Sequence, residues 1–565
     1  MKFIGIDIGD GESAAAVLND TGAVLPRVLD LGAYQSLLSV VGEAGGKPLV
    51  GQDVLLEPKA RGVSARFKSR FLTDPDAAGT IEKFAQGLRE KLAPTLQSGD
   101  FSIALGCPAG WTAHDRARYA DLVRGAGFPN LHAVAESRAA FLYTHYDTDI
   151  NLSPEELAQP TLVIDIGSST TDFAYIVEGK ETDVGVFGAN HLGGGQLDGL
   201  ILEDAVAQSG RREEIEKAFR AYPTWRNYCE LEARKLKETY FRQESLWVEH
   251  PCEVTSTIWA DVNAPLKLGF SLSRGKIQAL LNRPLEGEGS QSFLERLRAY
   301  LQAAVERTAA HPPRQLILTG GASRMEFFQQ ECRSAFPDAK LTVCRDPEFS
   351  IARGLSIAAR LDCSLERFRG QIDQFFKEGL LREDIRQNLH FLIRELTPVL
   401  EERIMTRCVE PVRKEKGMDA LQRQEELRER IRKEFEENPC TPETDAIVAA
   451  WIGARLTASQ ERLDGICEEN GVDRADMRLA RLGLRVSLDK LRLNLVRAQF
   501  LEFFREFLYN KLHVGKTPRR QVREALEKEL GKPDGDFSKR LIGDLEAELR
   551  QQIQDNIEKV EIHIS

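Results

Sequence analysis

The sequence predicts an α/β fold for about the first two thirds of the chain and an all-helical region after it. In the first part, short runs rich in Ile, Val and Leu end at Gly or Pro and have the length of buried strands. Helical patterns separate these runs, and such alternation is typical of an α/β domain. Beyond about residue 362, long charge-dense helical stretches replace the strand-like runs.

The apolar runs and the helical patterns can be assigned in chain order. Strands are expected over residues 2–9, 100–108 and 161–167, which read KFIGIDIG, DFSIALGCP and TLVIDIG. A helix is expected over residues 113–127. Residues 153–156, Ser-Pro-Glu-Glu, have the capping pattern with which another helix would begin.

The region 363–565 is expected to contain helices throughout. In residues 389–404, apolar side chains recur at every fourth position and would line one face of a helix. A second helix of this kind is expected over residues 491–508. Breaks that contain Pro predict two subdomains, about 363–438 and 441–565. The closing residues VEIHIS alternate like a short strand.

Composition and charge exclude several classes of protein. The formal net charge is -11 and no long basic block occurs, which argues against binding to a nucleic-acid backbone. The first residues, MKFIGIDIGD, contain acids and do not read as a signal peptide, and no run of about 18 apolar residues predicts a membrane span. The 9 cysteines form no CxxC pair, so neither a zinc site nor a disulfide framework is indicated. We therefore expect a cytoplasmic protein.

Two segments, residues 3–13 and 162–173, share one pattern. In each, an apolar strand ends in Asp-Ile-Gly and small polar residues follow. Backbone N–H groups of a Gly-rich turn can approach phosphate oxygens, and hydroxyl side chains can add donors. Asp7 and Asp165, at the two strand ends, are suited to hold a hydrated Mg²⁺. One hairpin alone is a weak signal, but two hairpins about 160 residues apart indicate a duplicated lobe.

These hairpins resemble those of actin, the sugar kinases and the seventy-kilodalton heat-shock chaperones, and further segments favour the chaperone branch. The further segments fall in the family's order, at residues 104–143, 191–198, 230–240, 270–281, 316–325 and 346–360. The resemblance covers residues 1–362 and implies an actin-like ATPase fold, in which two duplicated ribonuclease-H-like lobes surround a nucleotide cleft. It implies binding of ATP or ADP with Mg²⁺.

The resemblance also implies roles for individual residues near the phosphates. Asp7, Asp165 and Asp172 match the acids that anchor the Mg²⁺ waters, and Glu136 matches the residue that orients the attacking water. Lys68 matches the lysine that stabilises the transferring phosphate. Arg66 competes for this role, because the register is open by two residues. Thr170 matches a threonine beside the γ-phosphate.

The remaining contacts implied by the resemblance surround the rest of the nucleotide. Glu232 and Lys235 match a pair that brackets the ribose and the adenine, and Arg324 would stack on the base. The adenosine turn would consist of Gly320, Gly321, Ser323 and Arg324. The phosphate-binding turns would include Gly9, Asp10, Gly11, Gly167, Ser168, Ser169, Gly193 and Gly194.

Several departures from the family pattern affect the expected activity. Asp10-Gly11-Glu12 replaces two threonine hydroxyls in the first hairpin, and Ser168-Ser169 replaces a Gly-Gly pair in the second. Asp and Glu are acceptor-only when ionised, so ATP turnover is predicted to be slow. After Arg360, the acidic interdomain linker and the β-rich peptide-binding domain of the family give way to the helical pattern.

The leading functional hypothesis is an ATP-binding, slowly hydrolysing, chaperone-like protein whose helical region engages an unidentified protein partner. The main alternative is an actin-like filament-forming ATPase of the cytoskeleton. A small-molecule kinase on the same fold remains open, although no substrate-binding residue stands out. A membrane-surface role for the helices is disfavoured by the acidic balance.

Overall fold

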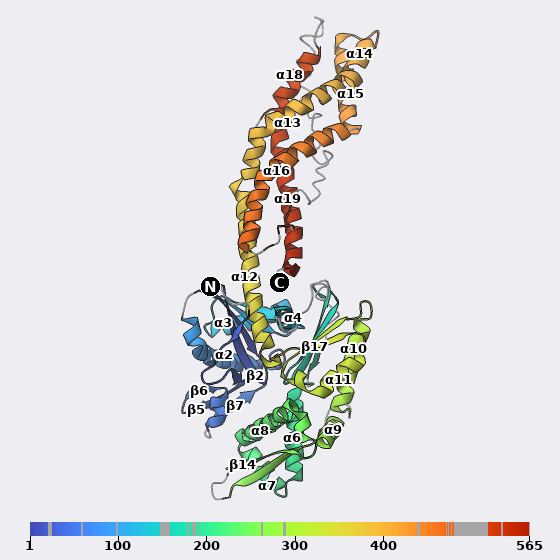
Figure 1. The fold of residues 1–565 in the computed structure, drawn as a ribbon. Coiled ribbons are helices and arrows are strands. Elements are labelled where there is room, and N and C mark those ends of the chain that lie inside the picture. Colours follow the sequence, from blue (N-terminus) through green and yellow to red (C-terminus); the bar gives the residue numbers. More distant parts are fainter. Residues whose placement is uncertain are drawn as a thin grey trace. The chain divides into compact units, whose positions relative to one another are not determined.

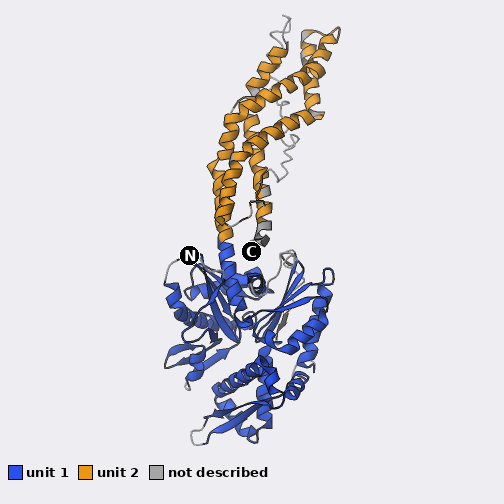
Figure 2. Ribbon diagram, viewed as in Figure 1, with its two compact units in different colours: residues 1–363, 565 blue, residues 364–564 orange. Residues whose placement is uncertain are grey.

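The computed structural model describes most of the chain and divides it into two compact units. Its description leaves out residues 21–24, 58–59, 98–99, 147–158, 178–179, 183–187, 191, 261–263, 286–289, 438–440, 471, 473, 476, 480–517, 533–534 and 564–565. Unit 1 comprises Met1–Cys363, and unit 2 begins at Ser364 (Figure 2). The division falls within helix α12, Pro347–Glu378. The predicted helix start at residues 153–156 lies outside the described residues.

The first sheet of unit 1 is built around β1, as the apolar run at residues 2–9 predicts. The strand order is β3-β2-β1-β8-β9, with β4 paired to β2. Strand β1 runs antiparallel to β2 and parallel to β8, and β8 runs parallel to β9. The strands are β1 (Lys2–Ile8), β2 (Glu12–Asn19), β3 (Arg27–Val28), β4 (Ser36–Leu38), β8 (Phe101–Cys107) and β9 (Leu131–Ala135).

The second sheet repeats this plan. Its order is β12-β11-β10-β16-β17, with β10 antiparallel to β11 and parallel to β16, and β16 parallel to β17. In both sheets the first hairpin therefore supplies the central strand, whose side chains are buried on both faces. The strands are β10 (Thr161–Ile166), β11 (Thr170–Val177), β12 (Lys180–Thr182), β13 (Gly188–Asn190), β16 (Gln315–Thr319) and β17 (Lys340–Val343).

Helices and two small sheets complete unit 1 (Figure 1). The helices are α1 (Gln52–Leu56), α2 (Pro75–Leu96), α3 (Ala113–Gly125), α4 (Glu136–Tyr146), α6 (Gly194–Gln208), α7 (Arg212–Ala221), α8 (Pro223–Arg242), α9 (Arg274–Leu281), α10 (Phe293–Arg307) and α11 (Glu326–Ala335), with 3-10 turns at Glu244–Trp247 and Gly321–Arg324. The small sheets contain β5 (Val40–Ala44), β6 (Lys47–Val50) and β7 (Arg61–Ala65), and β14 (Cys252–Ile258) and β15 (Leu266–Leu272). Unit 1 is thus a mixed α/β structure with several sheets.

Unit 2 is helical in the part that the structure describes, as the sequence predicts. Its helices are α13 (Leu380–Ile404), α14 (Glu410–Lys414), α15 (Ala420–Glu437), α16 (Pro442–Asn470), α18 (Pro518–Leu530) and α19 (Asp536–His563), and a π-helical turn spans Met405–Val409. The predicted stripe of α13 is buried in the core of the unit, at Leu392, Leu396, Leu400 and Ile404. The predicted helix over residues 491–508 lies outside the described residues.

The predicted strand in VEIHIS is wrong for the described residues, because α19 continues to His563. A single short strand needs a pairing partner, whereas each added helical residue gains a hydrogen bond within its own helix. Among the described helices, none combines the length and the low charge needed to cross a membrane.

Candidate functional site

A cavity of about 1100 Å³ lies in unit 1 where the two hairpins meet. The β1–β2 turn, the β10–β11 turn, the start of α6, one face of α8 and the 3-10 turn at Gly321–Arg324 line it. The sequence-predicted residues that line it are Asp7, Gly9, Asp10, Gly11, Lys68, Glu136, Asp165, Gly167, Ser168, Ser169, Thr170, Asp172, Gly194, Gly320, Gly321 and Arg324. The structure thus gathers these residues from six separate parts of the sequence around one space.

Close backbone packing holds the two hairpins against each other. A Cβ atom added to Gly11 would lie 2.8 Å from Cβ of Ser168, so this contact requires glycine. Gly320 has a φ of 78°, and a Cβ there would lie 2.4 Å from Oδ1 of Asp165. Both glycines therefore allow the backbone to approach the site more closely than other residues could.

Lys68 lies buried between two carboxylates. Its Nζ pairs with Glu136, which begins α4, and lies 3.8 Å from Oδ1 of Asp7. Burial alone would lower the pKa of Lys68. The nearby Glu136, Tyr119 and Asp7 together outweigh this effect, so the pKa lies well above its usual value. Burial raises the pKa of Asp7 to about 7, although the nearby lysine opposes this shift. Lys68 therefore stays charged, while Asp7 titrates near neutral pH.

The second hairpin adds two further carboxylates. Burial raises the pKa of Asp165 well above its usual value, and the charges of Glu136 and Asp172 raise it further. Burial also raises the pKa of Asp172, to about 6, although the Thr170 hydroxyl donates a hydrogen bond of 2.8 Å to it. Four carboxylates thus share one lysine, and this excess of negative charge favours a cation.

The carboxylates do not form a set of direct metal ligands. Within the described ranges, no group of three or more His, Cys, Asp or Glu side chains is close enough to hold a metal ion. Asp7, Asp165 and Asp172 therefore do not converge on one direct coordination site. Their arrangement fits a cation that keeps its waters, since Mg²⁺ gives up its hydration shell reluctantly.

The structure distinguishes Lys68 from Arg66. The Arg66 side chain does not line the cavity. It pairs with Glu230 on α8, and its Nη2 lies 3.4 Å from the carbonyl oxygen of Gly195. Of the two, Lys68 is the residue that lines the cavity and lies beside Glu136 and Asp7.

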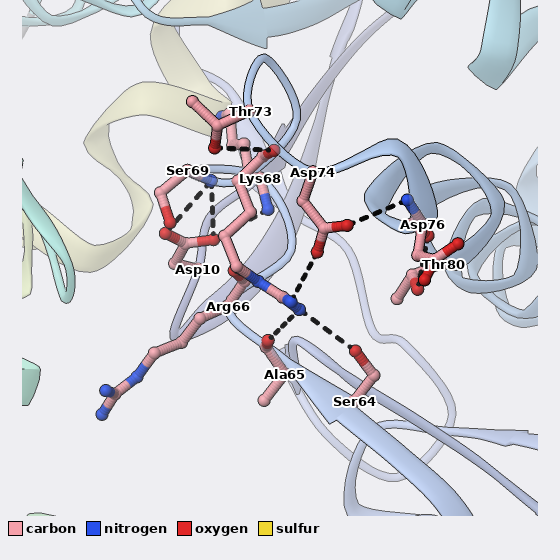
Figure 3. Close-up of polar contacts among 11 residues, drawn as sticks. Asp10, Ser64, Ala65, Arg66, Lys68, Ser69, Thr73, Asp74, Asp76 and Thr80 are labelled. Atoms are coloured by element: carbon pink, nitrogen blue, oxygen red, sulfur yellow. Dashed lines mark hydrogen bonds and ion pairs between the residues drawn. The ribbon is translucent and has the colours of Figure 1, made fainter.

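The two acids of the first hairpin are both engaged with other groups. Oδ1 of Asp10 accepts hydrogen bonds from the backbone N–H groups of Lys68 at 2.9 Å and Ser69 at 3.1 Å (Figure 3). Glu12 pairs with Arg234 of α8 at 2.9 Å. The charge of Glu12 is thus paired with a guanidinium group, whereas the charge of Asp10 is stabilised by two backbone N–H groups.

The predicted contacts of α8 need a correction in register. Glu232 and Lys235 do not line the cavity and pair with each other at 2.8 Å. The cavity is lined instead by Arg234, Lys237, Glu238, Phe241 and Arg242. These positions follow the spacing i, i+3, i+4, i+7 and i+8, which places them on one helix face. The sequence analysis missed them, because helical periodicity by itself allows either set of charged residues to face the cavity.

Lys237 is the most enclosed of these newly found residues. It is buried, its Nζ lies 2.6 Å from Oδ1 of Asp198, and it donates a 2.7 Å hydrogen bond to the carbonyl oxygen of Gly194. An ammonium group has three donors, so one N–H remains beyond these two contacts. Lys237 therefore places an ammonium group in the lining of the cavity.

The last predicted residues differ in their placement. Arg324 lines the cavity and pairs with Glu348 at 3.0 Å. Ser323 is buried within the adjoining 3-10 turn and does not line the cavity. Gly193 is the N-cap of α6 and also lies outside the lining, where a Cβ would come within 2.5 Å of the carbonyl oxygen of Ser168. Ser323 and Gly193 therefore pack behind the residues that line the cavity.

Comparison with known proteins is consistent with this architecture. The family described as Hsp70 protein matches residues 80–367, which is more than half of the chain. The chain belongs to the Hsp70 family. Hsp70 proteins are ATPases that bind ATP with Mg²⁺, and the family match implies an actin-like fold for unit 1.

Similar Hsp70 relatives are distant in sequence. "Chaperone protein dnaK1" of Synechocystis sp. is 23% identical over 408 residues, which are 63% of this chain and 54% of that protein. "Chaperone protein DnaK" of Thermoplasma volcanium is 23% identical over 352 residues, covering 58% of this chain and 53% of the relative. The chain thus spans about half the length of the curated relatives that it matches. The Hsp70 match begins at residue 80, after the first hairpin and after Lys68.

Proposed function

We propose that unit 1 binds ATP or ADP with Mg²⁺ in the cavity and hydrolyses ATP slowly. The observation that carries this proposal is the convergence of Asp7, Asp165, Asp172 and Glu136 around Lys68 within one cavity. The two sheets of equal plan would be the duplicated ribonuclease-H-like lobes. Membership of the Hsp70 family supports both statements.

The residues of the cavity suit a nucleotide with its metal. A hydrated cation would neutralise the carboxylates whose pKa values are raised, and it would offset the charge of the phosphates. The Ser169 hydroxyl lines the cavity, and its buried oxygen has no partner among the described residues. A buried hydroxyl of this kind favours a polar ligand, such as a phosphate oxygen, that would pair with it.

Specific roles follow for the residues around the phosphates. Lys68 would stabilise the charge on the transferring phosphate, since it is enclosed and remains protonated. Glu136 would orient the attacking water, once the cation and phosphates draw Lys68 away from it. Thr170 would lie beside the γ-phosphate, where its hydroxyl now donates to Asp172.

The adenosine end would be bound by a revised set of residues. Arg324, Gly320 and Gly321 keep their predicted role as the adenosine turn. On α8, Arg234 and Lys237 would replace Glu232 and Lys235, because they face the cavity. Arginine stacks readily on aromatic rings, so these side chains support the binding of a nucleobase.

Titration calorimetry tests this proposal directly. Wild-type protein and Asp165→Ala would be titrated with ATP and with ADP, each with Mg²⁺ and with EDTA. We expect Mg²⁺-dependent binding that weakens at least tenfold in Asp165→Ala. Asp121→Ala, which removes an exposed acid on α3, is the matched control. Equal affinity in all three proteins would overturn the role of Asp165, and no binding by the wild type would overturn the proposed function.

We also propose a chaperone-like role in which unit 2 binds a protein partner. Its support is that the relatives reported above bear the name chaperone and that unit 2 has an extensive core of its own. The test is whether the full chain, with and without ATP, reduces aggregation of an unfolded model protein. Sedimentation in the same buffers separates this role from the filament alternative, which predicts ATP-dependent pelleting.

A further inference from the structure

The loop that carries Lys68 connects β7 to α2, and buried aromatic side chains anchor it. Phe67 and Phe71 flank the lysine and are almost completely buried. The ring of Phe71 lies 5.2 Å from the ring of Trp111, and Phe67 lies 5.1 Å from Phe84 of α2. The residues between these anchors form a tight helical turn, in which the N–H of Phe71 donates to the carbonyl oxygen of Lys68 at 3.1 Å.

Arg70 and Asp74 fix the far end of this loop (Figure 3). Arg70 donates to the carbonyl oxygens of Ala65 and Arg66, each at 3.1 Å, and to Asp74 at 2.8 Å. Asp74 is also the N-cap of α2 and accepts a 3.0 Å hydrogen bond from the N–H of Asp76. The end of the loop is therefore attached to a long helix.

The near end of the loop is held by Asp10, from a distant part of the sequence. The N–H groups of Lys68 and Ser69 come at the start of the helical turn, where no carbonyl of the turn can accept from them. Oδ1 of Asp10 accepts from both, and its Oδ2 lies 3.3 Å from the N–H of Ser69. This is the arrangement of a helix N-cap, except that the capping residue lies 58 residues earlier.

From these contacts we propose that Asp10 is a positioning residue for Lys68. Asp10 fixes the backbone from which the lysine side chain reaches Glu136 and Asp7, so it acts through Lys68 and does not touch the phosphates. Its carboxylate oxygens accept hydrogen bonds and donate none, so they suit backbone N–H groups and not phosphate oxygens. The consequence of this positioning for hydrolysis rests on the proposed function of the site.

Two substitutions isolate the capping contact. Asp10→Ala removes the acceptor, whereas Asp10→Asn keeps one acceptor oxygen and removes only the charge. Asp121→Ala removes an exposed acid elsewhere in unit 1 and serves as the control. All variants are made in the full chain. Asp10→Asn also controls for a folding defect in Asp10→Ala, because asparagine keeps the shape of the aspartate side chain.

The readout is the reactivity of Lys68 in the absence of nucleotide. An amine-reactive reagent labels the folded protein, peptide mass spectrometry measures modification of Lys68, and hydrogen exchange is followed at residues 68 and 69. The Lys68 side chain is only 7% exposed in this structure, so the wild type should react slowly. We expect labelling and exchange to rise about fivefold in Asp10→Ala, in line with a lost cap, and to stay near wild type in Asp10→Asn. Equal rates in wild type and Asp10→Ala would overturn the proposal.

Single-turnover ATP hydrolysis then tests the functional consequence. In Asp10→Ala, hydrolysis should slow about tenfold while the affinity for ATP stays within about twofold, and Asp10→Asn should restore most of the rate. A loss of affinity without a change in rate would overturn a positioning role. If wild-type protein neither binds nor hydrolyses ATP, the proposed function fails, while the labelling result still decides whether Asp10 holds Lys68.

Discussion

The crowded carboxylates of the cavity predict that removing one of them stabilises the metal-free protein. Asp172→Asn is the most informative change, because the amide keeps the size of the side chain and can still accept from the Thr170 hydroxyl. Burial raises the pKa of Asp172 from its usual 3.8 to about 6. A shift of about two pH units corresponds to about 3 kcal/mol of unfolding free energy. Since the side chain of Asp172 is only half-buried, solvent screening reduces this cost, and we expect about 1–2 kcal/mol.

The sign of this effect depends on pH. Well below pH 4, Asp172 is protonated in both the folded and the unfolded chain, so wild type and variant should be equally stable. Between about pH 4 and pH 6 the unfolded chain ionises Asp172 while the folded wild type keeps it protonated, so the wild type progressively loses stability. Above about pH 6 the loss is complete, whereas the variant stays neutral throughout. The advantage of Asp172→Asn should therefore be largest at pH 7–8 in EDTA. Added Mg²⁺ should stabilise the wild type more than the variant, since the cation offsets the charge.

Urea unfolding followed by tryptophan fluorescence measures this difference. Four of the five tryptophans belong to unit 1, so a Trp451→Phe background restricts the signal to that unit. Asp121→Asn on the exposed face of α3 should change nothing and controls for net charge. If Asp172→Asn is less stable than wild type at pH 8 in EDTA, burial and the neighbouring carboxylates do not destabilise ionised Asp172 as argued.

Two further substitutions test other charged contacts. Glu12→Gln should raise ATP affinity severalfold, because it releases the Arg234 guanidinium from its ion pair within the cavity. Calorimetry should show that the gain in affinity shrinks in high salt. A gain independent of salt would contradict the electrostatic cause. In unit 2, the Glu434 carboxylate lies 2.8 Å from Nε of the buried Arg403. Glu434→Ala removes this carboxylate and should lower the unfolding free energy by about 3 kcal/mol. In urea unfolding of unit 2, Arg403→Met/Glu434→Leu should recover most of that loss, and no recovery would contradict a charge effect.

The hairpins could be predicted from sequence because each is a local pattern. Strands β1 and β10 are mostly apolar, and Asp7 and Asp165 are the last but one residue of each strand. In the structure, β1 lies between β2 and β8, and β10 lies between β11 and β16. The two similar sequence patterns therefore form the corresponding central strands of the two sheets. Both acids line the cavity for this reason. Their roles toward a nucleotide remain predictions.

The register of α8 could not be settled by the same reasoning. Glu232 and Lys235 are charged residues spaced i, i+3, and Arg234 and Glu238 are charged residues spaced i, i+4. Helical periodicity allows either pair to face a ligand, and only the packing of α8 against α6 and the small β14–β15 sheet selects between them. The face of α8 that packs into the core carries the buried residues Ala233, Leu236 and Tyr240. A residue pattern that includes these apolar positions would have favoured Arg234.

Contacts between residues that are distant in the sequence could not be predicted from local sequence patterns either. Asp10 looked like a misplaced acid in a phosphate-binding turn, where two unit charges about 4 Å apart would repel by about 4 kcal/mol at an effective dielectric of about 20. In the structure, the backbone N–H groups of Lys68 and Ser69 donate hydrogen bonds to the Asp10 carboxylate. Arg234 pairs with Glu12. Pairing with Arg234 offsets the charge of Glu12, whereas Asp10 keeps its negative charge, which also raises the pKa of Asp172.

A shortage of donors still gives a reason for slow turnover, which remains a prediction. The Thr170 hydroxyl is engaged with Asp172, so Ser169 is the hydroxyl of the second hairpin that lies buried without a partner in the described structure. Loss of one preorganised donor typically slows an enzyme by about 10²- to 10³-fold. Placing threonines at positions 10 and 11 would not by itself restore fast turnover. A side chain at Gly11 would collide with Ser168. Asp10→Thr would remove the carboxylate that accepts hydrogen bonds from the Lys68 loop. The hairpin and the lysine loop are thus matched to each other, and a faster enzyme would require changes in both.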